Sequence, residues 1–244
     1  MTLNFRDHDV EDYVALKDMD DTDVGVLDDL DRACLREIGE YLLTTDARQR
    51  YAMWLLHKHF EPAEGEVFVE RALRSAGTTE TAPVKRSAYS MRGLNASGIR
   101  FDADPGTGVS LIGLEFTEPS DFDDVAPLGD HDGPVLADIA ALLRSHGKID
   151  RFGVKVIRNP LGLSPDELLL ETCDTSTRTQ HCEKASRDAL SSGRTLIETT
   201  WRWCVVGGST TPVVMQECAA GCTPVGEGHD LAHHNTQYDD ESNN

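Results

Sequence analysis

Two histidines separated by one residue are the first feature of the sequence that could carry chemistry. His57 and His59 end an apolar stretch that begins at Tyr51. Residues two apart on a strand project from the same side, and two imidazoles on one side commonly hold a metal ion. We expect Glu66 or Glu70, on the next apolar stretch, to supply a carboxylate as a third ligand or as a partner of a ring N–H. Alternatively, both histidines are polar residues at the solvated end of a strand.

A second group of metal-ligand types lies near the C-terminus. Cys218, Cys222, His229 and His233 follow a Cys-x3-Cys-x6-His-x3-His order. Thiolates and imidazoles together suit zinc, iron or copper, although the gap between the two pairs is shorter than in a common zinc finger. Glycines between them give the backbone freedom to wrap an ion. The alternative is an acidic tail that carries histidines without binding anything.

The remaining motifs point to chemistry less directly. Cys173, His181 and Cys182 lie close together in the sequence and are either ordinary residues or a thiol–imidazole nucleophile pair. Trp201 and Trp203 share one strand face, which favours packing in the core over a ligand pocket. The sequence has no glycine-rich phosphate loop after a strand, no Gly-x-Ser-x-Gly and no His-Glu-x-x-His. We therefore expect no nucleotide cofactor.

The charge of the chain argues against two classes of partner. The 244 residues include 43 acidic and 23 basic side chains, for a formal net charge of -20. The basic residues are dispersed, so binding to nucleic acid or to an anionic membrane surface is not expected. No apolar run approaches 18 residues, and the N-terminus lacks the features of a secretory signal. These features predict a cytoplasmic protein whose cysteines are thiols or ligands.

Apolar periodicity predicts two helices and four hairpins. The helices run from about Leu27 to Leu43, with Leu27, Leu30, Cys34, Ile38, Tyr41 and Leu42 on one face, and from Pro134 to about His146, with Asp132 as N-cap. The hairpins cover about 50–70, 98–116, 151–171 and 195–216, with turns marked by proline and glycine. The polar stretches 72–97 and 172–195 are predicted to be loops.

The chain contains one pattern twice, which predicts its fold class. A shift of 101 positions superposes 35–70 on 136–171 with six identities, against about two expected by chance. We interpret this as a duplication that gives an α+β fold of two tandem pseudo-symmetric halves. Each half would be a helix followed by antiparallel β-hairpins. The predicted organisation is a leader (1–25), a first half (26–117), a linker (118–133), a second half (134–218) and a tail (219–244).

The sequence leaves three classes of function open. The leading hypothesis is a cytoplasmic metal-binding protein that acts on a small-molecule substrate if the ion keeps an open coordination position. With four protein ligands the metal would be structural. The alternatives are a non-catalytic module that binds a protein partner between the two repeats, and a small-molecule binder near the tryptophans. The kept pairs Arg50/Arg151, Glu66/Glu167 and Glu70/Glu171 are expected to form ion pairs of the scaffold.

Overall fold

The computed structural model describes residues 3–219, except 7, 20–22, 46, 90–92, 103–108, 120–124, 165–166, 187–195 and 207–208; beyond residue 203 only the backbone is described. Within these ranges the chain forms three α-helices, three short 3-10 helices and eleven strands. The helices are α1 (Val10–Val14), α2 (Asp29–Thr44), α3 (Gly133–Ser145), η1 (Ala47–Gln49), η2 (Arg86–Ala88) and η5 (Asp130–Asp132). The strands are β1 (Leu3–Arg6), β2 (Tyr51–Leu55), β3 (Glu66–Leu73), β4 (Thr78–Lys85), β5 (Asn95–Phe101), β6 (Val109–Thr117), β7 (Phe152–Val156), β8 (Glu167–Asp174), β9 (Thr179–Ser186), β10 (Leu196–Val206) and β11 (Ser209–Ala219).

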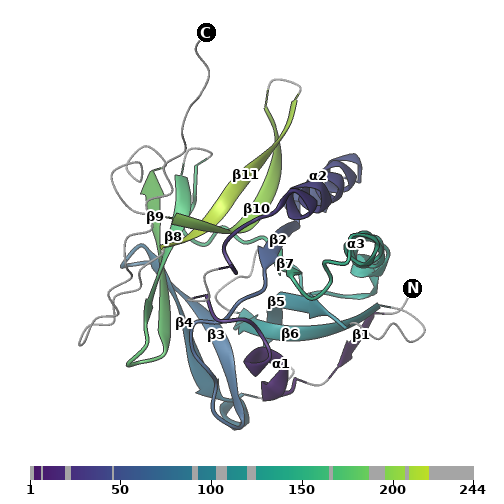
Figure 1. Ribbon diagram of the computed structural model, residues 1–244. Helices are drawn as coiled ribbons and strands as arrows, with labels where there is room; N and C mark the ends of the chain where they lie inside the picture. The colour runs from purple at the N-terminus through teal and green to yellow at the C-terminus, as the bar shows by residue number, and fades with distance from the viewer. Residues whose placement is uncertain are drawn as a thin grey trace.

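The eleven described strands form one curled, mixed sheet (Figure 1). Their order is β1-β6-β3-β4-β9-β8-β11-β10-β2-β7-β5, and β5 also pairs with β6, which brings the last strand back to the second. Three pairings are parallel: β1 with β6, β3 with β6, and β8 with β11. The curl gives the sheet an outer face and an inner face, and both faces bury apolar side chains.

The predicted fold class is wrong. The sequence pattern indicated two α+β halves, each with its own antiparallel sheet, but strands from both segments interleave in a single mixed sheet. β2 pairs with β7 and β10, β5 pairs with β7, and β4 pairs with β9, so strands of the two segments are hydrogen-bonded along four lines. The bounds of β2, β3 and β4 do recur 101 positions later in β7, β8 and β9. The duplication of the sequence itself stays a prediction.

Two of the four predicted hairpins are also wrong. β2 and β3 are not neighbours, because β2 lies between β10 and β7. Likewise β7 lies between β2 and β5, and β8 lies between β11 and β9. The cause is burial: all five residues of β2 are buried, so this strand needs backbone partners on both edges and an apolar layer on both faces. The antiparallel pairs β5–β6 and β10–β11 do form, as expected for 98–116 and 195–216.

The two stretches predicted to be polar loops contain strands instead. β4 forms a hairpin with β3, and β9 forms one with β8. The tight turns place Gly77 and Arg178 at positive φ angles, of 69° and 54°. β4 and β9 are rich in threonine and other polar residues, because they are paired on both edges but less covered by apolar layers than β2. A pattern based on apolar residues alone therefore missed them.

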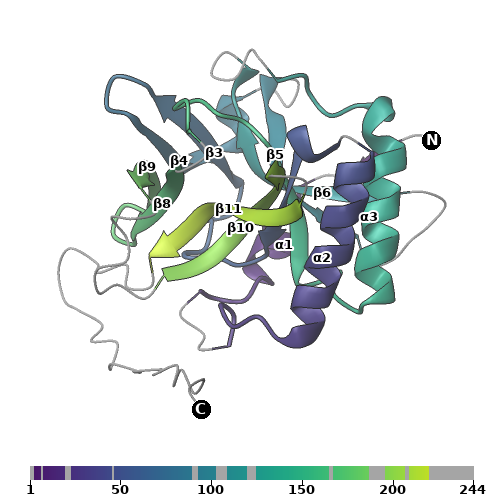
Figure 2. The same ribbon diagram turned by 90° about the horizontal axis from the view of Figure 1, so that it is seen from above.

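Both predicted helices are present, within two residues of their expected ends. α2 begins with a capping box between Asp28 and Asp31, and α3 has Pro134 in its first turn. The two helices pack side by side on the outer face of the sheet (Figure 2), where Tyr41 Oη donates a 2.7 Å hydrogen bond to Asp138. Leu30 is 62% exposed, so it does not belong to the apolar face predicted for α2. No helix of the described ranges is long and apolar enough to cross a membrane.

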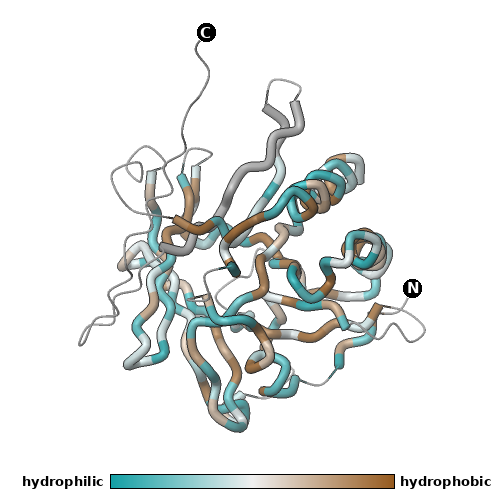
Figure 3. Tube along the Cα trace, in the orientation of Figure 1, coloured by the Kyte–Doolittle hydropathy of each residue, from teal (hydrophilic) through white to brown (hydrophobic). Residues whose placement is uncertain are grey.

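Apolar side chains gather on both sides of β2. Met53 and Leu55 face the helices and join the main core with Ile38, Leu42 and Ile139. Trp54 and Leu56 point the other way, into the inside of the curl, where a smaller cluster also contains residues of α1, β3 and β6. The brown segments of Figure 3 follow these surfaces. Trp201 and Trp203 lie in the main core, each 3% exposed, as predicted for core residues.

Candidate metal centre

His57 and His59 lie just beyond the end of β2, side by side. The two ring centroids are 4.8 Å apart, and the two Nε2 atoms are 3.1 Å apart. The two rings thus lie side by side, as their spacing predicted, although His59 stands at a bend and Lys58, between them, forms a bridge with Asp18. The ring of Trp54 packs edge-on against His57, with centroids 6.2 Å apart. Both imidazoles are therefore held in place by neighbours on the inner side of the sheet.

The carbonyl of Leu55 determines which nitrogen of His57 carries the proton. Nδ1 of His57 lies 2.7 Å from the Leu55 carbonyl oxygen, which can only accept a hydrogen bond. Nδ1 must therefore donate, and in the neutral ring Nε2 keeps its lone pair. A histidine that binds a metal usually donates its other ring N–H to a carbonyl or carboxylate in this manner. His57 thus presents an electron pair toward His59.

The third member of the group is Glu171, on β8. Its Oε1 atom lies 2.5 Å from Nε2 of His59 and 4.0 Å from Nε2 of His57. Glu171 reaches the inner side of the sheet by the two-residue alternation of β8, which sends Leu170 to the outer side. One ligand atom from each of His57, His59 and Glu171 lies within 4.8 Å of the other two.

The spacing of these three atoms is close to that of a metal-ligand set. Nitrogen and oxygen ligands lie about 2.0–2.2 Å from zinc, so two ligands at a tetrahedral angle are about 3.3 Å apart. The separations of 3.1 and 4.0 Å lie on either side of this value. The 2.5 Å separation of His59 and Glu171 is that of a charge-assisted hydrogen bond and would have to lengthen by about 0.8 Å around an ion.

The group is buried, and burial sets its electrostatics. The side chains of His57, His59 and Glu171 are 3%, 8% and 1% exposed. Burial lowers the pKa of His57 below its ordinary value of 6.5, so this ring is neutral near pH 7. For Glu171 burial acts in the opposite direction, but His59 and His57 together hold its pKa well below 4.5. The group therefore combines two imidazoles with one carboxylate anion.

Further charged residues line the inside of the curl. Nζ of Lys155, on β7, lies 3.1 Å from Glu115 Oε2 and 4.9 Å from the centre of the Trp54 ring. Burial lowers the pKa of Lys155, but the nearby carboxylates of Glu115, Glu171 and Glu70 more than compensate and raise it. Lys155 thus lies among the carboxylates of Glu115, Glu171 and Glu70.

The two carboxylates predicted as a third ligand lie elsewhere. Glu66 forms a salt bridge with Arg178 at 2.6 Å, which lowers the pKa of its carboxyl, and it also accepts a hydrogen bond from the Ala63 amide. Glu70 faces the interior near Lys155 but is not a member of the three-residue group. The carboxylate that meets the histidines comes instead from β8, more than a hundred positions away.

The other predicted ligands fall outside what the structure describes. Cys218 lies on β11, of which only the backbone is described there, and Cys222, His229 and His233 belong to the residues beyond 219. Among Cys173, His181 and Cys182, the register of β8 and β9 does not place the imidazole on the same face as either thiol. His181 and Cys182 are consecutive on β9 and project to opposite faces, and Cys182 is paired with Glu171 across the strands.

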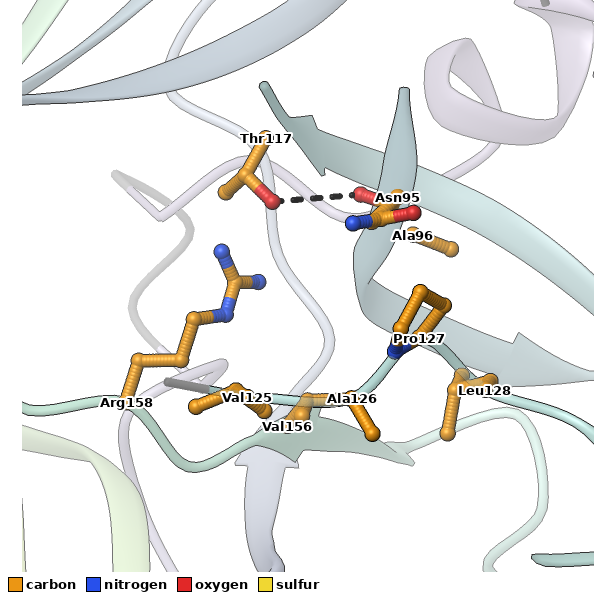
Figure 4. Close-up of a pocket in the computed structure, with 9 residues that line it drawn as sticks. All are labelled: Asn95, Ala96, Thr117, Val125, Ala126, Pro127, Leu128, Val156 and Arg158. Atoms are coloured by element: carbon orange, nitrogen blue, oxygen red, sulfur yellow. Dashed lines mark hydrogen bonds between the residues drawn. The ribbon is translucent and has the colours of Figure 1, made fainter. Parts of the chain in front are cut away.

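Two adjoining cavities lie away from this group. The larger, of about 220 Å³, is lined by residues that include Phe5 of β1, Asn95 of β5, Phe116 of β6 and His8, which lies between β1 and α1. The smaller, of about 10 Å³, holds the Arg158 side chain, which points toward Thr117 and Asn95 (Figure 4). Neither cavity is lined by His57, His59 or Glu171. A volume of 10 Å³ is enough for about one water molecule.

Sequence reasoning found the histidines but missed Glu171, although one signal was present. Glu171 ends the run Leu168-Leu-Leu-Glu171, and a carboxylate that follows buried apolar residues on a strand needs a partner. Its match with Glu70 across the 101-residue shift was interpreted as scaffold chemistry. Nothing local to either segment indicates that β8 and the end of β2 meet.

Comparison with known proteins adds no assignment to this geometry. No family model, no curated protein and no solved structure matches the chain.

Proposed function

We propose that the protein binds one divalent transition-metal ion through His57, His59 and Glu171. The observation that supports this most directly is the convergence of the three ligand atoms within 4.8 Å. The Leu55 carbonyl accepts a hydrogen bond from Nδ1 of His57, so the lone pair on Nε2 of the neutral ring is directed toward His59. A cation with short bonds to nitrogen and oxygen would contact all three ligand atoms together.

The ligand types favour zinc, iron or copper over calcium or magnesium. Imidazole nitrogen suits the transition metals, whereas magnesium and calcium prefer oxygen ligands alone. The Glu171 carboxylate would attract a divalent ion strongly, because the effective dielectric constant of a protein interior is far below that of water.

The role that fits this site best is to hold the fold together. In strand order, β10 and β11 separate β2 from β8, so an ion at this point would join two strands that share no hydrogen bonds. Metal binding to the folded chain alone adds directly to the free energy of unfolding. The low exposure of all three side chains supports a retained ion more than a site that exchanges substrate with solvent.

A direct test is to measure the metal content and affinity of protein purified without a histidine tag. We expect close to one equivalent of zinc, iron or copper per chain, or uptake of one Zn²⁺ in competition with a chelator. Glu171→Gln and His57→Gln should each weaken Zn²⁺ binding by more than the roughly 10–100-fold caused by altering an outer hydrogen-bond partner of a ligand. These variants keep the size of the side chain, or nearly so.

Matched controls are available elsewhere in the described chain. His146→Gln changes a histidine that pairs with Glu37 on the helices, and Glu167→Gln changes a carboxylate on the same strand as Glu171. Both should leave Zn²⁺ affinity unchanged. If the control variants weaken Zn²⁺ binding as much as Glu171→Gln and His57→Gln do, the ion binds elsewhere in the chain. The same conclusion follows if Zn²⁺ still binds when Glu171 and His57 are replaced together.

A cytoplasmic location belongs to the same proposal. The thiols of Cys34, Cys173 and Cys182 are not joined in disulfides, and this use of cysteine is typical of a reducing compartment. The formal charge of -20 supports a surface that neither nucleic acid nor anionic lipid would bind. Fractionation of cells that express the untagged chain would test the location.

A further inference from the structure

The strand pairing around the proposed metal centre recurs at a second place in the sheet. β8 pairs in parallel with β11, where Glu171 lies opposite Cys218, and β3 pairs with β6 in the same register 101 positions earlier. By the same shift, His57, two residues beyond β2, corresponds to Arg158, two residues beyond β7. The end of β7 is therefore the place in the sheet that corresponds to the metal centre, and it carries a guanidinium where the metal centre carries an imidazole.

The Arg158 side chain lines the smaller of the two cavities. It points toward Thr117 of β6 and Asn95 of β5 (Figure 4). Thr117 is 1% exposed, and its hydroxyl donates to the backbone carbonyl of Asn95 at 3.4 Å. Val125 and Val156 belong to the apolar part of the wall. A guanidinium among such neighbours is suited to bind a carboxylate, because its N–H groups match the two carboxylate oxygens.

The larger cavity adjoins the smaller one and is suited to an apolar group. Leu94, Phe116 and Phe5 line it together with residues that the two cavities share. The shared residues are Asn95, Ala96, Pro127 and Leu128. An apolar cavity of about 150 Å³ binds benzene, so a volume of about 220 Å³ admits one aromatic ring with a short side chain.

The described walls of the two cavities contain basic residues but no acidic ones. Arg6, His8 and Arg158 belong to the described lining, which includes no Asp or Glu. Across the whole chain, by contrast, 43 acidic residues outnumber 23 basic ones. Arg6 forms ion pairs with Asp12 and Asp102, whereas Arg158 is directed toward other residues of the cavity wall (Figure 4). The cavities therefore favour an anionic ligand over a cationic one.

We propose that the two cavities together bind a small aryl carboxylate, with the carboxylate at Arg158 and the ring in the larger cavity. The guanidinium of Arg158 donates to the two oxygens, and Asn95, in the wall that the cavities share, adds an amide donor. One carboxylate oxygen has about the size of the water molecule for which the smaller cavity has room. The ring packs against Leu94 and Phe116. This site is separate from the proposed metal centre and does not depend on it.

The test compares three ligands on the full chain by isothermal titration calorimetry, in EDTA so that no metal ion contributes. Phenylacetate has the ring and the charge, phenylacetamide has the same shape without the charge, and acetate has the charge without the ring. We expect phenylacetate to bind at one saturable site and phenylacetamide to bind about tenfold more weakly or worse, because hydrogen bonds between charged groups are the stronger ones. Acetate should bind more weakly than phenylacetate, because it leaves the larger cavity unfilled.

Two variants separate the role of the charge from that of the cavity. Arg158→Gln removes the charge, so it should abolish the preference for phenylacetate over phenylacetamide. Ala96→Leu fills part of the space that Ala96 lines, so it should weaken the binding of both ligands by a similar factor. Arg32→Gln is the matched control, because it removes the same charge from an exposed position on α2. It should leave the affinity for both ligands unchanged.

Equal affinity of the wild type for phenylacetate and phenylacetamide would overturn the carboxylate site, as would a preference for phenylacetate that survives in Arg158→Gln. A wild type without saturable phenylacetate binding would overturn it too. The comparison of ligands on the wild type needs no variant, so it decides the question even if Arg158→Gln fails to fold. Because these titrations are made without metal, the carboxylate site and the Zn²⁺ site can fail separately.

Discussion

Nε2 of His59 lies 2.5 Å from Oε1 of Glu171, although the two residues are 112 positions apart. Both side chains are almost fully buried, so neither can be satisfied by water. The contact joins the end of β2 to the middle of β8 across the inside of the sheet. A buried carboxylate with an imidazole partner makes folding depend on proton concentration and, if the site takes a cation, on metal concentration.

Acidification of the metal-free protein should remove stability in two steps. The pKa of His57 is lowered from 6.5 by burial, so below about pH 6.5 the unfolded chain binds this proton first and the folded state loses stability. The pKa of Glu171 is held well below 4.5, mainly by His59, so its contribution is present above pH 4.5 and is lost as the pH falls further. Each group gives a slope of roughly 1.4 kcal/mol per pH unit.

Urea unfolding of the wild type, His57→Gln and Glu171→Gln between pH 7.5 and about 2.5, in EDTA, would measure these slopes. The difference between the wild type and His57→Gln should change mainly below pH 6.5, and that between the wild type and Glu171→Gln mainly below pH 4.5. Stability curves that run parallel over the whole range would show that these two groups do not carry the pH dependence.

Zinc should raise the melting temperature of the wild type. Free Zn²⁺ at about 100 times its Kd adds about 2.7 kcal/mol to the free energy of unfolding. At roughly 2–4 °C per kcal/mol for a chain of this size, Tm should rise by about 5–11 °C. Thermal scans of Glu171→Gln with the same Zn²⁺ should show little change. A rise of similar size in that variant would mean that the ion stabilises the fold from another site.

Replacing Lys155 should affect stability and metal affinity in opposite directions. Lys155→Met leaves the Glu115 carboxylate without its 3.1 Å partner, and the loss of one member of a buried ion pair costs about 3 kcal/mol. The same change removes a positive charge close to Glu171, so Zn²⁺ affinity should increase, by about tenfold for each 1.4 kcal/mol of repulsion relieved. Urea unfolding and chelator competition on the same samples measure both. Weaker Zn²⁺ binding would contradict this account.

The sequence predicted the positions of the helices and strands better than it predicted which strands pair with each other. The acidic start of α2, Pro134 at the start of α3 and the apolar faces of both helices are local features, so the helix ends were found within two residues. Asp132 does stand at the N-cap of α3, but its side chain makes no capping hydrogen bond. β2 was found too, from its apolar run, but its neighbours were not. Strand pairing depends on which other strands can cover both edges of a buried strand, and this is decided across the whole chain.

For the same reason, the two histidines of the site could be predicted from the sequence but the carboxylate could not. His57 and His59 lie on one short segment, so a spacing of one residue is enough to keep the two rings close together. Glu171 joins them through the curl of the sheet, which no local pattern encodes. Glu66 was a reasonable expectation by proximity in sequence, but Arg178, in the turn between β8 and β9, lies beside it and pairs with it.

Two ion pairs connect the two halves of the sequence. One joins the residue before β2, which follows α2, to the start of α3, and the other joins the residue before β7, which follows α3, to the first turn of α2. Arg50 donates to Asp132, at the start of α3, at 2.5 and 2.9 Å, and Tyr51 Oη donates to the same carboxylate. Arg151 donates to Asp31, in the first turn of α2, at 2.9 Å. The two arginines thus form ion pairs, as expected, but their partners are aspartates and not the glutamates that the two repeats share. Asp132 and Asp31 are 2% and 1% exposed, and the arginines are 23% and 21% exposed.

Asp132→Asn and Asp31→Asn should each destabilise the protein by about 2–3 kcal/mol at pH 7. This is below the range for a fully buried pair, because the guanidinium groups are partly solvated. Burial raises the pKa of Asp132, but Arg50 and Tyr51 lower it below 3.8 overall, so this stability is present above pH 3.8 and lost below it. Urea unfolding would measure the loss, with Asp138→Asn, at an exposed contact with Tyr41, as a control expected to cost under about 1 kcal/mol.

Gly39 should be irreplaceable in the middle of α2, because Trp203 occupies the space of its side chain. A Cβ atom at Gly39 would lie 1.9 Å from Trp203 Nε1 and 2.4 Å from Cδ1, and Trp203 is fixed in the main core. Alanine is the better helix former by about 1 kcal/mol, yet overpacking costs about 1–3 kcal/mol or more. We expect a net loss in Gly39→Ala and partial recovery in Gly39→Ala with Trp203→Leu. Glu40→Ala, on the exposed side of the same turn, should be neutral or stabilising, and a Gly39→Ala protein as stable as the wild type would contradict the packing of α2 on β10.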